Sequence, residues 1–280
     1  MHKNLIVTVN YHNYAVTRQM IESYMRLLQY ELVDLIIVDN MPEKSELAKL
    51  ADYIKQNDLL TTVKIVESDK NLGYFGAFKY ALNNYVNIND YQNIIISNND
   101  ILFKDTEFFN KLNAINFDYH ILAPSIRTMN KGIQQNPHSL YPPGRTRNIG
   151  YKFYFFCYCF AYLITVLSKI KSGISANRKA QVEFTSQDIY SPHGAFIIFN
   201  QKYFRDGGYI DTGYFLYGEE ASVAAIAKQK SFSVIFYPEL EVIHNEHQST
   251  NFSILSRRMY RFQKESYIYI NNKYGVYKNH

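Results

Sequence analysis

Short apolar runs alternate with amphipathic segments over residues 1–100 of the chain. We predict strands where the apolar run is continuous, and helices where apolar residues recur every three or four positions. The strands are predicted at residues 5–9, 34–40, 63–67 and 94–97, and the helices at residues 17–28, 45–57 and 71–84, the last after a glycine-containing loop. Continuous apolar strands that alternate with helices indicate an α/β protein, with a mostly parallel sheet covered by helices on both faces.

Each predicted strand ends in polar residues. These residues are Asn10, Asp39, Ser68 and Asp69, and finally Asn98, Asn99 and Asp100. The carboxyl ends of parallel strands meet at one edge of a sheet, and open α/β sheets bind their ligands there. We therefore expect these side chains to converge on one crevice.

Beyond residue 125 the alternation breaks down, and an aromatic segment follows at residues 150–167. We predict one helix there, too short and too rich in tyrosine to span a membrane. Basic residues flank it, namely Arg145, Arg147, Lys169 and Lys171. This pattern is typical of a helix that lies in the plane of a membrane surface. A packing helix, or a contact between copies of the chain, explains it equally well.

The candidate chemistry lies in residues 207–249, after a predicted strand at residues 196–199 and before a basic, aromatic helix at residues 253–274. Two adjacent carboxylates, Glu219 and Glu220, follow an aromatic run, and a strand-like segment then leads to His244. In a low-dielectric setting two such carboxylates repel each other, which raises the pKa of at least one and suits it to proton abstraction. The simpler interpretations are a solvated helix start and a core histidine.

The turn at residues 98–100 is the second candidate. Asn and Asp are favoured in any turn after a strand, yet a carboxylate with a neighbouring amide is also the minimum for holding Mg²⁺ or Mn²⁺. Asp39 is suited to hydrogen bonding with a nucleobase or ribose, or to capping the next helix. The glycines of residues 71–76 allow the backbone to approach a ligand, or simply mark the entry to a helix.

The composition is that of a globular protein, because 47% of the 280 residues are hydrophobic and 20% are charged. The net charge of +5 fits an anionic membrane surface or a phosphate-bearing substrate better than duplex DNA, so we expect no nucleic-acid partner. Cys157 and Cys159 indicate neither a disulfide framework nor a zinc site. The chain shows no signal-peptide pattern and no run of about 18 apolar residues. We therefore expect a cytoplasmic protein that can bind the inner face of the cell membrane.

Seven motifs occur in the order found in one enzyme family. They are VTVNYHN (residues 7–13), IIVDN (36–40), NLGYFGA (71–77), IISNND (95–100), PHGAFII (192–198), GGYIDTGYFLYGEE (207–220) and the return from Pro238 to His244. Together they resemble the bacterial inverting glycosyltransferases of family 2, in particular the rhamnosyltransferase-like members that build capsule and O-antigen polysaccharides. The resemblance implies a GT-A fold with a Rossmann-like sheet over residues 1–250. It divides the chain into a nucleotide-binding part (1–125), an insertion (about 141–185), an acceptor and catalytic part (186–250) and a C-terminal helix (251–280).

The resemblance also assigns roles to individual residues. It places Asn10, Asp39, Asn71, Gly73, Asn98 and Gly194 at the nucleotide sugar, Asp100 and His244 at the metal, and Glu220 at the catalytic base with Glu219 beside it. Asn98 stands where the family has an acidic residue, which predicts weaker metal binding. Ser222 and Ile226 replace an acid and an arginine of the family, which leaves the identity of the sugar open.

The implied reaction is a direct displacement with inversion. Glu220 would remove the proton from a hydroxyl of a lipid-linked saccharide, while Mn²⁺ or Mg²⁺ with His244 would stabilise the departing nucleoside diphosphate. Two alternatives stay open at this point, a nucleotidyltransferase and a catalytically inactive sugar-binding or scaffold subunit. The oligomeric state is also open.

Overall fold

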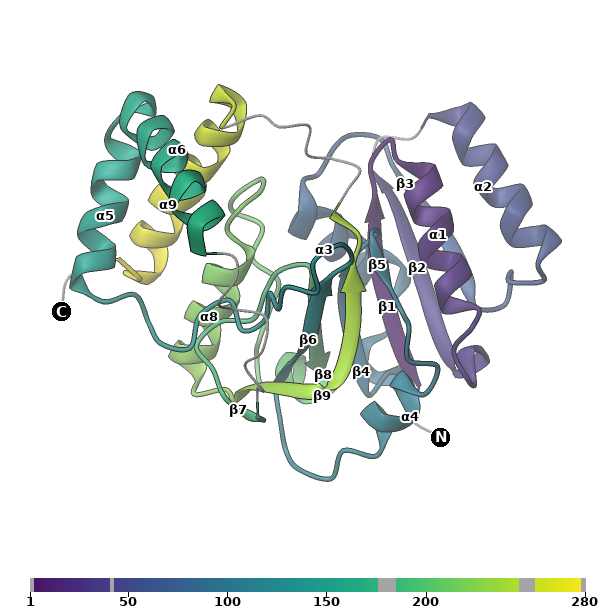
Figure 1. Cartoon of the computed structure of the whole chain (residues 1–280). Coiled ribbons are helices and arrows are strands. Elements are labelled where there is room, and N and C mark those ends of the chain that lie inside the picture. The colour runs from purple at the N-terminus through teal and green to yellow at the C-terminus, as the bar shows by residue number, and fades with distance from the viewer. Residues whose placement is uncertain (1–2, 41–42, 176–184, 247–254, 278–280) are drawn as a thin grey trace.

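The computed structural model describes residues 3–40, 43–175, 185–246 and 255–277, and its centre is one curled sheet with helices on both faces (Figure 1). The strands lie in the order β3-β2-β1-β4-β8-β6-β9-β5, and β7 pairs with β9. Their bounds are β1 Asn4–Asn10, β2 Val33–Asn40, β3 Val63–Ser68, β4 Asn93–Asn98, β5 Ile101–Leu102, β6 Ile121–Thr128, β7 Gln187–Asp188, β8 Phe196–Asn200 and β9 Val234–His244. The predicted α/β class is confirmed.

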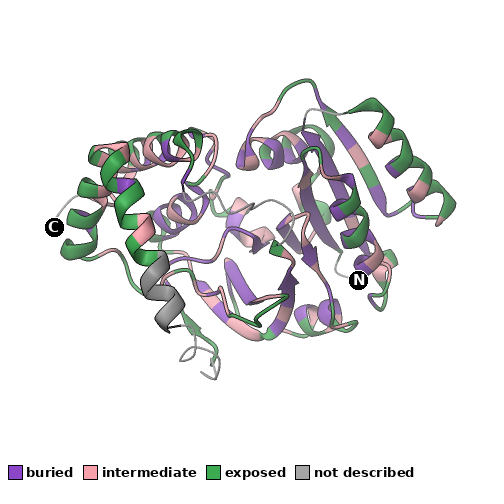
Figure 2. Cartoon of the chain, turned by 45° about the horizontal axis from the view of Figure 1, so that its top comes forward, coloured by how far each residue is buried: buried purple, intermediate pink, exposed green. Residues whose placement is uncertain are grey.

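Helices cover both faces of the sheet, which explains why the strands are continuous apolar runs. The helices are α1 Tyr14–Tyr24, α2 Lys44–Gln56, α3 Tyr74–Tyr85, α4 Phe108–Asn113, α5 Arg145–Phe156, α6 Tyr158–Ser175, α7 Gln201–Arg205, α8 Glu219–Lys230 and α9 Arg257–Tyr274. In β2, Leu35 and Ile37 pack with α1, α2 and α4, whereas Ile36 and Val38 pack with α3 and α8. Figure 2 shows the central strands largely buried. Each such side chain contributes about 1.5–3 kcal/mol when it is fully buried.

The direction of the strands differs between the two halves of the sheet. The first half, β3-β2-β1-β4, is parallel, as predicted. In the second half β8 runs antiparallel to β4 and β6, and β5 and β7 run antiparallel to β9. Strands β6 and β9 are parallel, so the predicted parallel arrangement holds for the first half and for this pair, whereas the other pairings of the second half are antiparallel. The chain enters β8 at the edge where β4 ends, and a parallel strand would have needed a crossover back to the opposite edge.

A layer of three helices, α5, α6 and α9, stands beside the sheet (Figure 1). The aromatic segment forms two helices, so the prediction of one helix at residues 150–167 was wrong. The break is at Cys157, whose φ of −147° and ψ of 161° are those of an extended residue. The break lets α6 pack against α9, where Ala161 contacts Tyr260 and Leu255, and the Tyr158 hydroxyl donates a hydrogen bond to the Leu255 carbonyl (2.7 Å).

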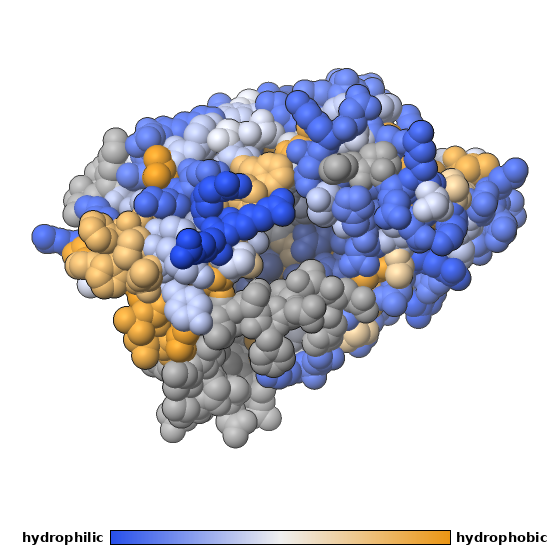
Figure 3. Space-filling model, turned by 90° about the horizontal axis from the view of Figure 1, so that it is seen from above, coloured by the Kyte–Doolittle hydropathy of each residue, from blue (hydrophilic) through white to orange (hydrophobic). Residues whose placement is uncertain are grey.

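The outer face of this layer is apolar. The most exposed apolar side chains of α5 and α6 are Phe153 (60%), Phe156 (72%), Leu163 (53%) and Leu167 (56%). Figure 3 shows hydrophobic side chains gathered on the left of the molecule, where these helices lie. The side chains of Lys169 and Lys171, predicted to flank the segment, lie outside the described part of the chain. Among the described helices, none combines the length and the apolarity needed to cross a membrane.

A buried carboxylate fixes α9 to the loop that leads into α8. Asp211 is 4% exposed and accepts hydrogen bonds from the Tyr269 hydroxyl (2.9 Å), Lys273 Nζ (3.1 Å) and the Tyr274 hydroxyl. Burial alone would raise the pKa of Asp211, but these donors outweigh it and the pKa lies below its ordinary value. Removing one hydrogen-bond donor from such a buried carboxylate typically costs about 1–3 kcal/mol. The anchored loop, residues 211–218, therefore keeps a defined position.

Candidate active site

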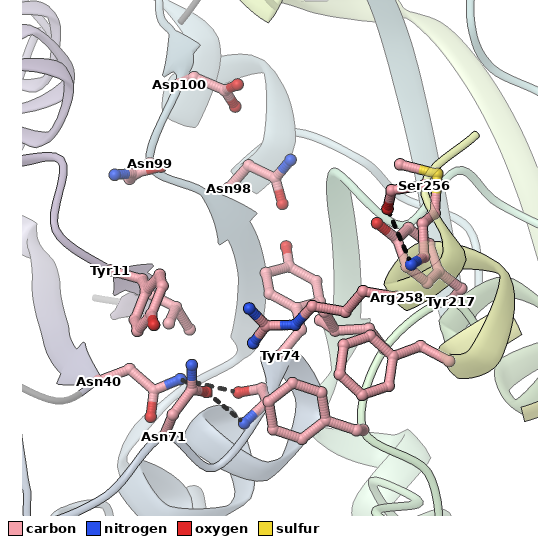
Figure 4. Close-up of a pocket in the computed structure, with 16 residues that line it drawn as sticks. Tyr11, Asn40, Asn71, Tyr74, Asn98, Asn99, Asp100, Tyr217, Ser256 and Arg258 are labelled. Carbon is pink, nitrogen blue, oxygen red and sulfur yellow. Dashed lines mark hydrogen bonds between the residues drawn. The ribbon is translucent and has the colours of Figure 1, made fainter. Parts of the chain in front are cut away.

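A cavity of about 610 Å³ opens at the carboxyl ends of β1, β2 and β4 (Figure 4). Its sheet side consists of Val9, Tyr11, Asn40, Asn71, Gly73, Tyr74, Asn98, Asn99 and Asp100, and its cover consists of Phe215, Leu216, Tyr217, Ser256, Arg258, Met259 and Phe262. Polar ends of strands that are distant in the sequence thus meet in one crevice. The cover comes from α9 and from the loop that Asp211 anchors.

Asn40 organises the deep wall of this cavity. Its Nδ2 donates hydrogen bonds to Asn71 Oδ1 (3.0 Å) and the Gly73 carbonyl (3.1 Å), and its Oδ1 accepts the Leu72 N–H (2.8 Å). Gly73 has a φ of 76°, and a Cβ there would lie 2.2 Å from the Phe215 carbonyl oxygen. Only glycine therefore allows the loop at residues 71–73 to touch the anchored loop.

Asn10 and Asp39 lie beneath the cavity and do not line it. Asn10 is 0% exposed and Asp39 is 1% exposed. The Asp39 carboxylate accepts hydrogen bonds from Asn10 Nδ2 (2.9 Å) and the Tyr14 hydroxyl (2.7 Å). Asn10 Oδ1 in turn accepts a hydrogen bond from Thr17 (2.8 Å). Asn10 and Asp39 therefore hold the ends of β1 and β2 together and fix them to α1.

Asp100 and His244 form the polar corner of the site. Asp100 Oδ1 lies 3.1 Å from His244 Nε2, but the two atoms are not aligned for a hydrogen bond, and Asp100 Oδ1 is buried without another partner in the described structure. His244 Nδ1 lies 2.7 Å from Gln135 Oε1, an acceptor, and this contact orients the ring so that Nε2 faces Asp100. Asn98 Nδ2 is 3.5 Å from the same nitrogen.

This corner suits a divalent cation. A carboxylate oxygen and an imidazole nitrogen are both groups that would hold Mn²⁺ or Mg²⁺, and here the two face each other. Within the described residues, however, no three His, Cys, Asp or Glu side chains gather to hold a metal. A cation bound here would therefore need further ligands from a substrate or from water.

The two adjacent glutamates at the start of α8 have different surroundings. Glu220 accepts a hydrogen bond at Oε1 from the Gly194 N–H (3.1 Å), and a Cβ on Gly194 would lie 2.8 Å from that oxygen. Gly194 therefore contacts the Glu220 carboxylate and does not line the large cavity. Glu220 also lines a second cavity of about 300 Å³ between α5, α8 and α9, and Tyr217 lines both cavities.

Glu219 is 6% exposed, and its Oε1 has no hydrogen-bond partner in the described structure. Burial, together with the adjacent charge of Glu220, raises the pKa of Glu219 to about 8. Its Oε2 accepts the Gly218 N–H (2.8 Å), which moderates the shift. Glu219 is therefore protonated near neutral pH, whereas Glu220 faces a cavity.

Sequence reasoning missed several residues of the site. Tyr74 lines the large cavity and donates a hydrogen bond to the Gly194 carbonyl (3.2 Å), which connects the cavity to the glutamates. Burial and the charges of Glu219 and Asp100 raise the pKa of Tyr74 well above its ordinary value, so it stays a donor. Arg258 reaches from α9 into the cavity (Figure 4).

Tyr74 lies within one of the quoted motifs, so a signal for it was present. Nothing near Arg258 in the sequence indicates that this side chain lines the same cavity as residues 98–100. Ser222 and Ile226, the two residues of α8 that differ from the family pattern, lie away from the cavities. They are 0% and 1% exposed, in the core. The Ser222 hydroxyl pairs with the Tyr214 hydroxyl (2.7 Å).

No protein-family model matches the sequence, and no curated protein matches it. Solved structures do match the fold. GalNAc-T7, crystallised with UDP, GalNAc and Mn²⁺, aligns with a TM-score of 0.58 at 15% identity over 88% of this chain and 44% of its own. The mannosyltransferase PcManGT from Pyrobaculum calidifontis, in complex with GDP-Man and Mn²⁺, aligns with a TM-score of 0.53 at 13% identity over 98% of this chain and 71% of its own.

A third similar structure is residues 1–349 of TarS from S. aureus, with a TM-score of 0.51 and 13% identity over 84% of this chain and 60% of its own. The chain therefore spans less than two thirds of the length of GalNAc-T7 and of this TarS fragment. All three are GT-A-type glycosyltransferases. The GT-A fold that the motifs implied is thus confirmed.

Replacing Glu219 by glutamine should flatten the dependence of stability on pH. The folded protein keeps a proton on Glu219 up to about pH 8, whereas the unfolded chain releases it near pH 4.5. Between these values the folded state binds more protons, so the free energy of unfolding falls as pH rises, by up to about 1.4 kcal/mol per pH unit. Urea unfolding across this pH range measures the slope. Equal slopes for wild type and Glu219→Gln would contradict the assignment, and Glu239→Gln, an exposed site on β9, is the matched control.

Proposed function

We propose that this protein is an inverting glycosyltransferase that moves a sugar from a nucleotide-diphosphate donor to a hydroxyl of an acceptor saccharide. One observation carries the proposal. The large cavity ends at the Asp100–His244 corner, and Tyr74 and Gly194 connect that corner to the Glu219–Glu220 pair. A volume of about 610 Å³ is in the range of small-molecule sites. The GT-A neighbours, two of them solved with nucleotides or nucleotide sugars and Mn²⁺, support the same conclusion.

The donor would lie along the large cavity. Tyr11 and Asn71 offer a ring and an amide group to the nucleoside at one end, and Asn40 holds Asn71 in place. Asp100 and His244 would hold Mn²⁺ or Mg²⁺ at the other end, where the ion would neutralise charge on the departing diphosphate. Arg258 has no carboxylate partner among the described residues, and it is free to pair with a phosphate from the side of α9.

Glu220 is the group that would take the proton from the acceptor hydroxyl. Gly194 fixes one carboxylate oxygen, and the carboxylate lies at the second cavity, from which an acceptor can approach. Tyr217 lines both cavities and so stands where donor and acceptor would meet. With the base on one side and the leaving group on the other, the displacement inverts the anomeric carbon.

The motif resemblance supports a more specific assignment within this activity. We infer a role like that of the rhamnosyltransferase-like enzymes, with a lipid-linked saccharide as acceptor, in the synthesis of capsule, O-antigen or another cell-surface polysaccharide. Asn98 leaves Asp100 as the only carboxylate in the turn at residues 98–100, so metal affinity should be modest.

A nucleotide sugar should stabilise the protein against heat only when a divalent ion is present. The measurement is a thermal-shift screen with UDP-, GDP- and dTDP-sugars, each with Mn²⁺, Mg²⁺ or chelator. A ligand at about 100 times its Kd stabilises by about 2.7 kcal/mol. Asp100→Asn should lose the metal-dependent part of the shift, because one of the two protein ligands becomes a neutral amide.

Two controls sharpen this screen. Asp118→Asn changes a carboxylate that is 92% exposed and should leave the shift unchanged. Arg258→Ala should weaken donor binding about tenfold through the loss of one phosphate contact, whereas Arg261→Ala, on the same helix but outside the cavity, should not. If no nucleotide sugar shifts the melting temperature, the donor assignment fails, and a shift with nucleoside triphosphates alone would favour a nucleotidyltransferase.

Glu220→Gln should abolish sugar transfer without weakening donor binding. The amide oxygen can still accept the Gly194 N–H, so the fold is preserved, but the side chain can no longer take a proton. Loss of a general base typically lowers kcat by about 10²- to 10⁴-fold. Radiolabelled donor with membrane saccharide extract measures transfer, and titration calorimetry measures donor affinity. Full activity in the variant would exclude Glu220 as the base, and no activity in wild type would favour the scaffold alternative.

We also infer that the exposed face of α5 and α6 binds an anionic membrane surface. Phe153, Phe156 and Leu163 are more than half exposed, and the exposed basic residues Arg145 and Lys152 lie on the same pair of helices. Phe153→Ser with Phe156→Ser should lower partitioning onto vesicles that contain phosphatidylglycerol about tenfold. Phe117→Ser, at a partly exposed phenylalanine elsewhere, is the control. Unchanged cosedimentation would remove the membrane assignment.

A further inference from the structure

Three cavities join into one groove that starts at Glu220 and runs along α8. The first is the cavity of about 300 Å³ that Glu220 lines, the second is a neck of about 40 Å³, and the third has about 420 Å³. His138, Tyr151, Ala221 and Tyr277 line both the first cavity and the neck. Pro143, Tyr190 and Val276 line both the neck and the third cavity. The shared lining residues place the three cavities next to one another along α8.

The groove is longer than one sugar ring is wide. Along α8 its lining runs from Glu220 through Ala221 and Ala225 to Lys228. At 1.5 Å per residue, these eight steps of helix span about 12 Å. The opposite wall is aromatic, and Tyr151, Tyr267 and Tyr277 pack against one another there with ring centres 4.8–6.1 Å apart. Aromatic walls with a few polar groups are typical of sites that bind small ligands.

The far end of the groove is electropositive. Arg145 and Lys228 line the third cavity, no Asp or Glu lines it, and neither cation has a carboxylate partner among the described residues. The same cavity receives the N-terminus of α5, which begins after Gly144 and therefore has no capping side chain. The free N–H groups and the dipole at a helix start favour an anion.

An unpartnered buried side chain marks this end as a binding site. Asn148 lines the third cavity, is 3% exposed, and its Oδ1 has no hydrogen-bond partner within the described structure. A buried amide oxygen without a partner is costly, typically by about 1–3 kcal/mol. A ligand with hydroxyl groups beside its charged group would satisfy it.

We propose that the groove binds the acceptor, and that the acceptor is an extended saccharide with an anionic group, a phosphate or a carboxylate, one or more sugar units away from the reacting hydroxyl. The hydroxyl lies at Glu220, the sugar rings lie against Tyr151, Tyr267 and Tyr277, and the anion lies between Arg145 and Lys228. This inference rests on the proposed transferase activity, since that activity makes Glu220 the reacting end.

The test is binding of the purified protein to a glycan array that carries neutral, phosphorylated and uronic-acid-containing oligosaccharides of increasing length. We expect the bound glycans to be anionic and longer than one unit. Lys228→Gln and Arg145→Gln should each weaken that binding about tenfold, the effect of one charge-assisted hydrogen bond. Both side chains are exposed at the rim, so neither variant should unfold the protein.

The matched control is Lys230→Gln on α8, an exposed lysine outside the groove, which should bind as wild type does. Preference for phosphorylated or for uronic-acid glycans identifies the source of the charge. The proposal is overturned if neutral glycans bind equally well, if inorganic phosphate alone competes as strongly as the glycan, or if no glycan binds. Donor binding, measured separately at the large cavity, distinguishes these outcomes from a failure of the transferase assignment.

Discussion

The geometry of the site depends on the pairing of β4 with the antiparallel strand β8. Ser97 pairs with Phe196, and the Asn98 N–H donates to the Ala195 carbonyl (2.8 Å). Because β8 begins where β4 ends, Gly194 lies beside the turn that contains Asp100, and its N–H can hold Glu220. A parallel β8 would start at the opposite edge of the sheet and separate the glutamates from the metal corner. One reversal of strand direction therefore brings the Asp100–His244 corner and the Glu219–Glu220 pair together.

The C-terminal helix α9 lines both the large cavity at the edge of the sheet and the second cavity beside Glu220. Asp211 anchors α9 to the loop before α8, and the Ser266 hydroxyl donates to the Leu216 carbonyl (2.6 Å) farther along. With the helix in that place, Phe262 and Arg258 close the large cavity while Tyr267 walls the second one. The same anchor therefore shapes both cavities. The buried Asp211 carboxylate thus has a structural role, because it positions the loop at residues 211–218.

The first hundred residues could be predicted well because both faces of β1, β2 and β4 are buried, and such strands appear as uninterrupted apolar runs. Helix boundaries were less predictable. Helix α1 starts at Tyr14 and not at residue 17, since the Tyr14 hydroxyl bonds to Asp39, a contact that local periodicity does not contain. The break at Cys157 carries no proline or glycine and reflects packing on α9. The polar ends of the strands predicted that residues 98–100 lie at the cavity. Arg258 could not be predicted there, because only the tertiary position of α9 brings it to the cavity.

The roles of the adjacent glutamates are separated by environment. Glu219 is enclosed by its own loop, and burial with the neighbouring charge raises its pKa to about 8. A neutral Glu219 removes the repulsion that two adjacent carboxylates would otherwise have at the start of α8. Of the two side chains only Glu220 lines a cavity, so burial keeps a protonated carboxyl in the core and leaves the other carboxyl at the cavity.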